Sequence, residues 1–174
     1  MEIFLSVRGG AKLKIRHAVK EDLERLAQIE AVSYPEAEGA SLESIRGRLG
    51  VYPDHFWLLE ADDGQIAAFV NGFVTGQADL TDEMYDKPQM HDPQGDWQMI
   101  FSVVTSPEYR KRGYAGLLLE QVIADAKREG RKGIVLTCKD RLIPYYSKFG
   151  FQNEGVSQSV HGNVVWYQMR ISFI

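Results

Sequence analysis

The stretch from Met99 to Gly116, MIFSVVTSPEYRKRGYAG, has the residue types and spacing needed to bind a phosphate-bearing ligand. The apolar run Ile100–Val104 predicts a largely buried strand, because β-branched and aromatic residues suit a pleated surface. Pro107 ends that strand, and a helix is predicted a few residues later. Backbone N–H groups at a helix N-terminus lack intrahelical acceptors, and the helix dipole adds partial positive charge, so both favour a bound anion.

The turn before this helix supplies cations and space for such an anion. Arg110, Lys111 and Arg112 can make charge-assisted contacts with phosphate oxygens. Gly113 and Ala115 are small, so a pyrophosphate could approach the backbone closely. An exposed basic turn before an ordinary helix is the alternative, and the three cations alone favour it. The combination of strand, proline, small residues and helix start favours the anion site.

The same turn resembles the signature of a known family. Arg110-x-x-Gly113-x-Ala115 matches the Gln/Arg-x-x-Gly-x-Gly/Ala pattern of the GNAT acyl-CoA N-acyltransferases, and the preceding Pro-Glu-Tyr-Arg is their usual lead-in. A second segment, Cys138–Phe151, is similar to the segment that ends the GNAT core, most closely in the arylalkylamine N-acetyltransferase branch. The resemblance covers roughly residues 13–171, and its specific parts are 99–116 and 134–151.

This resemblance implies a cofactor and the residues that bind it. The co-substrate would be acetyl-CoA, with no metal. Its pantetheine arm would lie along the backbone of Val103, Val104 and Thr105. Its pyrophosphate would lie on the turn and the first helical residues, so the predicted cofactor-binding set also contains Arg110, Lys111, Arg112, Gly113, Tyr114, Ala115 and Gly116.

Acyl transfer from a thioester to an amine needs a neutral amine, a stabilised oxyanion and a proton for the departing thiolate. The resemblance places the thiolate near the Tyr146 hydroxyl, which is a neutral donor at pH 7. Tyr146 is therefore the predicted general acid. A phenol packed in the core with one hydrogen bond is the alternative, and it is the preferred reading for Tyr145. The oxyanion donor would be a backbone N–H near Val103.

The base has no clear candidate. The arylalkylamine enzymes typically place two histidines on the central strand, at positions that match Met99 and Phe101, and neither side chain can accept a proton. Glu30, His91 or Asp96 could act through water, or the amine could lose its proton to solvent. Taken singly, each of these three groups is more often a solvated surface residue.

The predicted substrate-binding residues come from the same resemblance. Tyr34 matches an aromatic residue that walls the amine pocket in the arylalkylamine enzymes, and simple core packing is an equally weighted alternative. Met99 and Phe101 complete this set. The acidic loop 76–95 would attract a cationic amine if it borders the pocket.

Composition limits the class of protein. The 174 residues are 44% apolar and 25% charged, as expected for one globular domain over 1–174, with 1–11 either a short strand or a loose extension. The formal charge of −4 argues against a general nucleic-acid binder. A single cysteine, Cys138, and no signal-like or membrane-length apolar run favour a cytoplasmic protein without membrane contact. The oligomeric state is open, a homodimer included.

Hydrophobic periodicity predicts the elements that must position these residues. Strands are expected over 13–16, 56–60, 66–75, 97–105, 134–137 and 164–171, and helices over 20–34, 41–49, 114–129 and 141–148. Asp62-Asp63-Gly64 predicts an antiparallel hairpin, and one helical turn is expected at 82–85. The helix 114–129 would join two parallel strands.

The fold class is therefore α/β, a GNAT acyl-CoA N-acyltransferase fold. Its mixed, mainly antiparallel sheet would be splayed near Val103–Thr105 and Ile134–Thr137, with helices on both faces. The expected function is acetyl-CoA-dependent N-acetylation of a small primary amine by direct attack in a ternary complex. The alternatives are acetylation of a protein or peptide, and a non-catalytic acyl-CoA-binding sensor.

Overall fold

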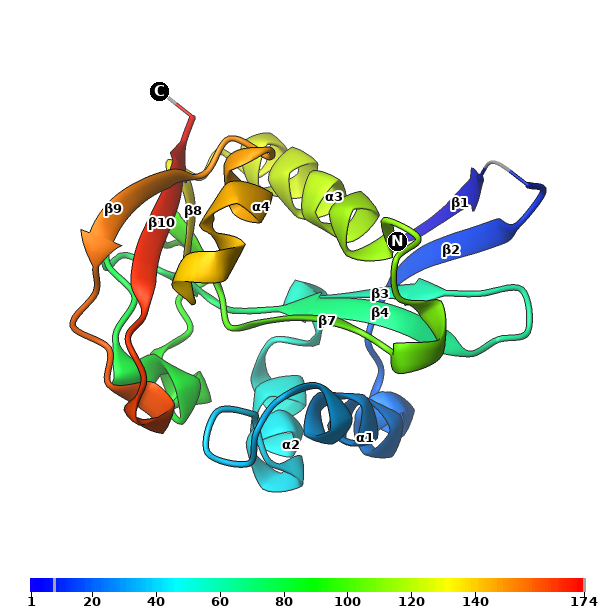
Figure 1. Ribbon diagram of the computed structural model, residues 1–174, viewed down its shortest axis with the longest axis horizontal. Coiled ribbons are helices and arrows are strands. Elements are labelled where there is room, and N and C mark those ends of the chain that lie inside the picture. The colour runs from blue at the N-terminus through cyan, green and yellow to red at the C-terminus, as the bar shows by residue number, and fades with distance from the viewer. Residues whose placement is uncertain (8, 174) are drawn as a thin grey trace. The chain divides into compact units, whose positions relative to one another are not determined.

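The computed structural model describes residues 1–7 and 9–173, which form two compact units (Figure 1). Unit 1 contains Met1–Asn71 and Ser102–Leu119, and unit 2 contains Gly72–Phe101 and the chain from Glu120 onward. Each unit has its own sheet and is described separately. The organisation of 1–174 as one functional domain stays a prediction.

Unit 1 is built on an antiparallel sheet. Among the described residues it has five strands in the order β1-β2-β3-β4-β7. These strands are β1 (Glu2–Ser6), β2 (Lys12–His17), β3 (Phe56–Glu60), β4 (Ile66–Asn71) and β7 (Ser102–Thr105). The β3–β4 hairpin confirms the turn predicted at Asp62-Asp63-Gly64, where Gly64 has a φ of 78°. The pairing of β1 with β2 shows that Glu2–Ser6 is a strand.

Two helices cover one side of this sheet. They are α1 (Leu23–Ser33), which follows a 3-10 turn at Lys20–Asp22, and α2 (Leu42–Val51). Both lie on the same side of β3, β4 and β7 in Figure 1, and α1 packs on β7. The Ser41 hydroxyl caps α2 by accepting a hydrogen bond from the Ser44 N–H at 3.1 Å. The first turns of α3 lie on the opposite side, as predicted for a sheet with helices on both faces.

Unit 2 is built on a mixed sheet. In the described part of the chain it has five strands in the order β5-β6-β8-β10-β9. These strands are β5 (Val74–Thr75), β6 (Trp97–Ile100), β8 (Gly133–Cys138), β9 (Gln152–Val156) and β10 (Tyr167–Ser172). Only β6 and β8 pair in parallel within that sheet, and α3 (Tyr114–Arg128) precedes β8 as the predicted crossover helix.

Short helical elements complete unit 2. The helix α4 (Ile143–Ser147) follows a 3-10 turn at Asp140–Leu142 and packs on β9 and β10. Two further 3-10 turns, Asp82–Tyr85 and Pro88–Met90, interrupt the predicted loop 76–95, and the first confirms the expected turn at 82–85. Across residues 1–7 and 9–173, no helix combines the length and apolar character that a membrane crossing requires.

The two central strands are each broken, which corrects the prediction of continuous strands over 66–75 and 97–105. The first run divides into β4 and β5, and the second divides into β6 and β7. Asn71 lies opposite Ser102, whereas Val74 lies opposite Gln98. Gly72 and Phe73 on one strand therefore lie opposite the three residues Met99–Phe101 on the other. This extra residue is a β-bulge.

An ion-pair network joins three elements of unit 1. The Arg16 guanidinium donates to both carboxylate oxygens of Asp22 at 2.9 Å and to the Glu60 carboxylate at 2.7 Å. The Val19 N–H donates to Asp22 at 2.8 Å. Burial alone would raise the pKa of Asp22, but the hydrogen bonds from Arg16 and Val19 outweigh it and hold the pKa below its ordinary value.

Replacing Asp22 should therefore destabilise the protein in a pH-dependent way. Because the folded pKa is depressed, the stabilisation is present above the unfolded pKa of about 4 and is lost as the pH falls through the folded value. We expect Asp22→Asn to lower the free energy of unfolding by about 1–3 kcal/mol at pH 7, and by less at pH 3. Urea unfolding at both pH values measures this difference.

Glu43→Gln is the matched control, because Glu43 pairs with Arg46 at the surface with 75% of its side chain exposed. Its effect should stay within about 0.5 kcal/mol at pH 7. If Asp22→Asn lowered the free energy of unfolding equally at pH 3 and pH 7, the lowered pKa of Asp22 would be contradicted.

Candidate functional site

The strand β7 presents outward peptide groups at the edge of the unit 1 sheet. The Ser106 N–H donates to the Ala67 carbonyl at 2.8 Å, which fixes the alternation of the antiparallel ladder. By that alternation, the N–H and C=O groups of Val103 and Thr105 point away from β4. β7 is also the last strand in the order of this sheet. The predicted pantetheine strand is thus an edge with directed main-chain donors.

Side chains hold both outward carbonyls of β7. The Tyr34 hydroxyl donates to the Val103 carbonyl at 3.1 Å, and Arg110 Nε donates to the Thr105 carbonyl at 3.2 Å. Tyr34 follows the last residue of α1, so α1 and the basic turn are both tied to the same edge. The structure therefore brings Tyr34, predicted as a substrate residue, onto the predicted cofactor strand.

The turn before α3 has an unusual backbone. Lys111 has a φ of 66° and Gly113 a φ of 78°, and a left-handed conformation is uncommon for a lysine. The first intrahelical bond runs from the Leu117 N–H to the Gly113 carbonyl at 3.2 Å. The N–H groups of Tyr114, Ala115 and Gly116 thus fall in the first turn, where an α-helix offers no acceptor. Left-handed residues beside such donors form concave anion sites.

The basic side chains line this turn. All three of Arg110, Lys111 and Arg112 are exposed. Arg110 also donates to the Ser33 hydroxyl at 3.3 Å, and Arg112 lies over the Tyr109 ring at 5.5 Å. A Cβ added at Gly113 would meet nothing within 4 Å, so its conformation rather than crowding requires glycine there. The open space agrees with room for a ligand.

Met99 and Phe101 have different surroundings in unit 2. Met99 is 0% exposed, so its side chain belongs to the core. Phe101 is half-buried and its ring packs against Phe73 at 5.0 Å and Tyr85 at 5.1 Å. Tyr85 also stacks on His161 at 4.7 Å. Phe101 is therefore the more accessible of the two predicted substrate residues, in an aromatic group that the sequence analysis did not find.

Tyr146 lies in α4 and is 7% exposed. Its ring meets those of Tyr145 and Phe151 edge-on, at 5.1 Å and 5.8 Å. The neighbouring Tyr145 is half-buried, and that burial raises the pKa of its phenol. Packing on β9 and β10 fixes α4, and with it the Tyr146 ring. The role of Tyr146 as a general acid stays a prediction.

The three candidate bases are held in different ways. Glu30 is 2% exposed and accepts hydrogen bonds from the Ala40 N–H at 2.9 Å and the Ser102 hydroxyl at 3.3 Å. His91 Nδ1 accepts from the Val74 N–H at 3.1 Å, so the neutral ring carries its proton on Nε2. Asp96 is half-exposed and pairs with Lys132. His91 thus has no lone pair left for a substrate proton.

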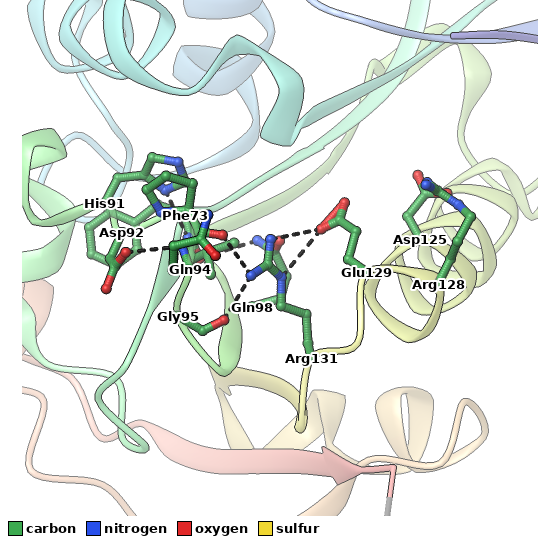
Figure 2. A network of polar contacts seen from close by, with 12 residues as sticks. Phe73, His91, Asp92, Gln94, Gly95, Gln98, Asp125, Arg128, Glu129 and Arg131 are labelled. Carbon is green, nitrogen blue, oxygen red and sulfur yellow. Dashed lines mark hydrogen bonds and ion pairs between the residues drawn. The ribbon is translucent and has the colours of Figure 1, made fainter.

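A polar network fixes the end of the acidic loop in unit 2 (Figure 2). Arg131 donates to the Pro93 and Gly95 carbonyls, both at 2.8 Å, and pairs with Glu129 at 3.0 Å. The Asp92 N–H donates to the Val74 carbonyl at 2.8 Å. The loop 76–95 therefore returns to the sheet through defined main-chain contacts.

Comparisons with known proteins agree with this geometry. The family model described as "Acetyltransferase (GNAT) family" matches residues 20–151, and the chain belongs to that family of acetyltransferases. A serotonin N-acetyltransferase of Mesocricetus auratus is 26% identical over 154 residues, which cover 82% of this chain and 73% of that protein.

Solved structures share the fold. The loading GNATL domain of CurA from Lyngbya majuscula superposes with a TM-score of 0.79 at 17% identity, over 92% of this chain and 97% of that one. The GNAT-like decarboxylase GphF, in complex with isobutyryl-CoA, gives a TM-score of 0.77 at 21% identity, over 91% and 98% of the two chains. The predicted GNAT fold is confirmed.

The backbone of the turn predicts opposite effects for two glycine substitutions. At Gly113 a Cβ would be strained by the φ of 78°, so Gly113→Ala should lower the free energy of unfolding by about 1–2 kcal/mol. Gly50 lies inside α2 with open space around it, so Gly50→Ala should raise that free energy by about 0.5–1 kcal/mol. Denaturant unfolding measures both, and equal shifts would contradict the turn geometry.

Proposed function

We propose that this acetyltransferase moves an acetyl group from acetyl-CoA to the nitrogen of a small primary amine, by direct attack in a ternary complex. The observation that carries the proposal is the turn at the start of α3, with its left-handed Lys111 and Gly113. The proposal takes the chain as a single acetyltransferase domain in a reducing cytoplasm.

The residues present fit the chemistry of coenzyme A. Main-chain donors at 114–116 and the three exposed cations suit a pyrophosphate. The pantetheine arm contains amide groups, and the outward peptide groups of Val103 and Thr105 can pair with them as one strand pairs with another. The complex of GphF with isobutyryl-CoA supports an acyl-CoA ligand in this fold.

The acceptor is inferred from the relative and from the aromatic group of unit 2. The relative at 26% identity is described as a serotonin N-acetyltransferase, so its acceptor is a small primary amine. Phe101 and Tyr85 are half-buried aromatic side chains that suit a flat apolar substituent. The proposed acceptor is therefore an amine on a short chain that carries an aromatic ring.

In this scheme Tyr146 gives a proton to the departing thiolate and regains one from solvent, while the attacking nitrogen releases its surplus proton to solvent. The Tyr146 hydroxyl would protonate the departing thiolate, because a phenol is a neutral donor at pH 7. Met99 and Phe101 cannot take a proton, and the remaining ring nitrogen of His91 is itself a donor. Glu30 and Asp96 are already held by a main-chain N–H and by Lys132. We therefore assign no protein base and infer that the amine loses its proton to solvent and enters in its neutral form.

Removing the Tyr146 hydroxyl tests the proposal. With acetyl-CoA and a panel of amines, Tyr146→Phe should lower kcat by about 10²–10⁴-fold while the KM for acetyl-CoA stays constant. Tyr145→Phe is the matched control and should keep kcat. Release of free thiol measures turnover. An equal kcat for wild type and Tyr146→Phe would contradict the role, turnover on peptides alone would favour the protein-acetylating alternative, and binding without turnover would favour the sensor.

Because this scheme has the amine lose its proton to solvent, it predicts how kcat/KM depends on pH. The value of kcat/KM should rise about tenfold per pH unit until the pKa of the amine itself is reached. Two amines whose pKa values differ by about two units should give profiles displaced by about the same amount. A bend at one fixed pH for both amines would reveal a protein base and contradict this part of the scheme.

A further inference from the structure

The strand β1 forms one edge of the unit 1 sheet (Figure 1). It pairs with β2 without a register shift over its whole length, Glu2–Ser6. In the hairpin that joins the two strands, the Val7 N–H donates to the Ala11 carbonyl at 3.0 Å. Bonded and non-bonded residues alternate along an antiparallel ladder, so every second residue counted back from Val7 bonds to β2. The peptide groups of the other three strand residues point away from the sheet, and these residues are Glu2, Phe4 and Ser6.

Nothing in β1 itself blocks the approach of a further strand. Edge strands are commonly protected by lysine, proline, a bulge or short length. The sequence of β1, EIFLS, has no lysine or proline, and its ladder has no bulge. The other edges differ. Gly155 in β9 has a φ of 95°, and the pairing of β9 with β10 shifts register. The strand β5 has two residues, and on β7 the side chains of Tyr34 and Arg110 cover the outward carbonyls.

The side chains of β1 are apolar on both faces of the sheet. Phe4 is 74% exposed on one face. Ile3 and Leu5 are half-buried on the other face. There they lie beside Ile15 and Leu13 of β2, which are buried in the core. A neighbouring strand would cover the exposed parts of these side chains, which is favourable. The strand thus offers both unpaired peptide groups and apolar surface.

This edge is complementary to a second copy of itself. In an antiparallel pair of β1 strands centred on Phe4, outward peptide groups meet outward peptide groups, and about six main-chain hydrogen bonds form. Phe4 then lies opposite Phe4 of the other copy, as a cross-strand aromatic pair. On the core face, Ile3 lies opposite Leu5 of the other copy. The apolar row of each sheet therefore continues into the other.

The charges fit this antiparallel direction. Glu2 of each copy lies opposite Ser6 of the other, so the two Glu2 residues are about 14 Å apart along the strands. Lys12 is exposed and is the β2 residue opposite Ser6. Its side chain can extend past the short serine toward Glu2 of the other copy. A parallel pair would instead bring the two Glu2 side chains together, so charge favours the antiparallel pair.

We propose that a second copy of this chain docks on β1 in this antiparallel register and forms a two-fold symmetric dimer. Such an isologous contact uses the same surface on both copies. Two paired strands of five residues bury less area than a standard protein interface, so the dimer is weak and depends on protein concentration. The proposal is independent of the proposed acetyl transfer, because β1 contributes no residue to that site.

Substitution of Phe4 tests the dimer, because this side chain is exposed in the single chain and lies opposite its own copy in the pair. Sedimentation velocity of the wild-type chain from about 5 to 500 µM should show a monomer–dimer equilibrium. Phe4→Lys places two like charges opposite each other and should weaken dimerisation at least about tenfold. Val156→Lys is the matched control, since Val156 is 66% exposed on the edge strand β9, and it should leave dimerisation unchanged.

Two further measurements test the register. Phe4→Glu alone should also weaken dimerisation, but an equimolar mixture of Phe4→Lys and Phe4→Glu should associate at least about tenfold more tightly than either variant alone, because opposite charges then face each other. Amide hydrogen exchange is the second measurement. The Phe4 and Ser6 amides should exchange more slowly in concentrated than in dilute wild-type protein, whereas the Ile3 and Leu5 amides, already bonded to β2, should change little.

Each contrary outcome overturns the proposal. A wild-type chain that stays monomeric at about 500 µM contradicts the dimer. Equal effects of Phe4→Lys and Val156→Lys on dimerisation would show that another surface carries it. A mixture that associates no better than its two components, or Phe4 and Ser6 amides whose exchange is independent of concentration, contradicts the antiparallel pair centred on Phe4. Acetyl transfer is measured separately, so its failure would leave the dimer unaffected.

Discussion

The proposed site depends on main-chain donors that the secondary structure directs outward. A helix cannot satisfy the N–H groups of its own first turn, and an edge strand leaves every second peptide group unpaired by the sheet. Unit 1 brings both cases together in the continuous segment from Ser102 to Gly116. The left-handed Lys111 and Gly113 allow the chain to pass from the edge strand to the helix within a few residues. A ligand complementary to this segment would carry an anionic group for the helix start and an arm with amide groups for the edge strand.

Local signals explain how much of the fold could be predicted from the sequence. The Asp-Gly hairpin and the helices that begin near Ser41 and Tyr114 depend on near neighbours in the chain, and the structure agrees with each. The bulge arises from the pairing of two strands that are distant in the sequence. Its residues are apolar like those before and after them, so hydrophobic periodicity predicted unbroken strands over 66–75 and 97–105. Gly72 was the one local sign of close backbone approach.

The candidate site likewise contains residues that short motifs predicted and residues that depend on contacts between distant segments. The turn residues and Tyr146 were predicted from short motifs, and their roles stay predictions. Met99 is fully buried and Phe101 is not, and this difference in exposure does not follow from the spacing of residues in the sequence. The contact between the Tyr85 and Phe101 rings does not follow from that spacing either. Gln98 and Arg131 were missed because their acceptors are carbonyls from distant segments. A polar residue in an apolar strand, such as Gln98, is the signal that could have pointed to a main-chain role.

The proposed function requires the turn before α3 to bind the pyrophosphate of coenzyme A through its main-chain N–H groups. Titration of ¹⁵N-labelled protein, followed by amide chemical shifts, tests this binding with coenzyme A and with pantetheine, which lacks the pyrophosphate. We expect saturable shifts of the Gly113, Tyr114, Ala115 and Gly116 amides with coenzyme A alone. Unshifted amides in this turn at saturating coenzyme A, or equal shifts with pantetheine, would contradict it.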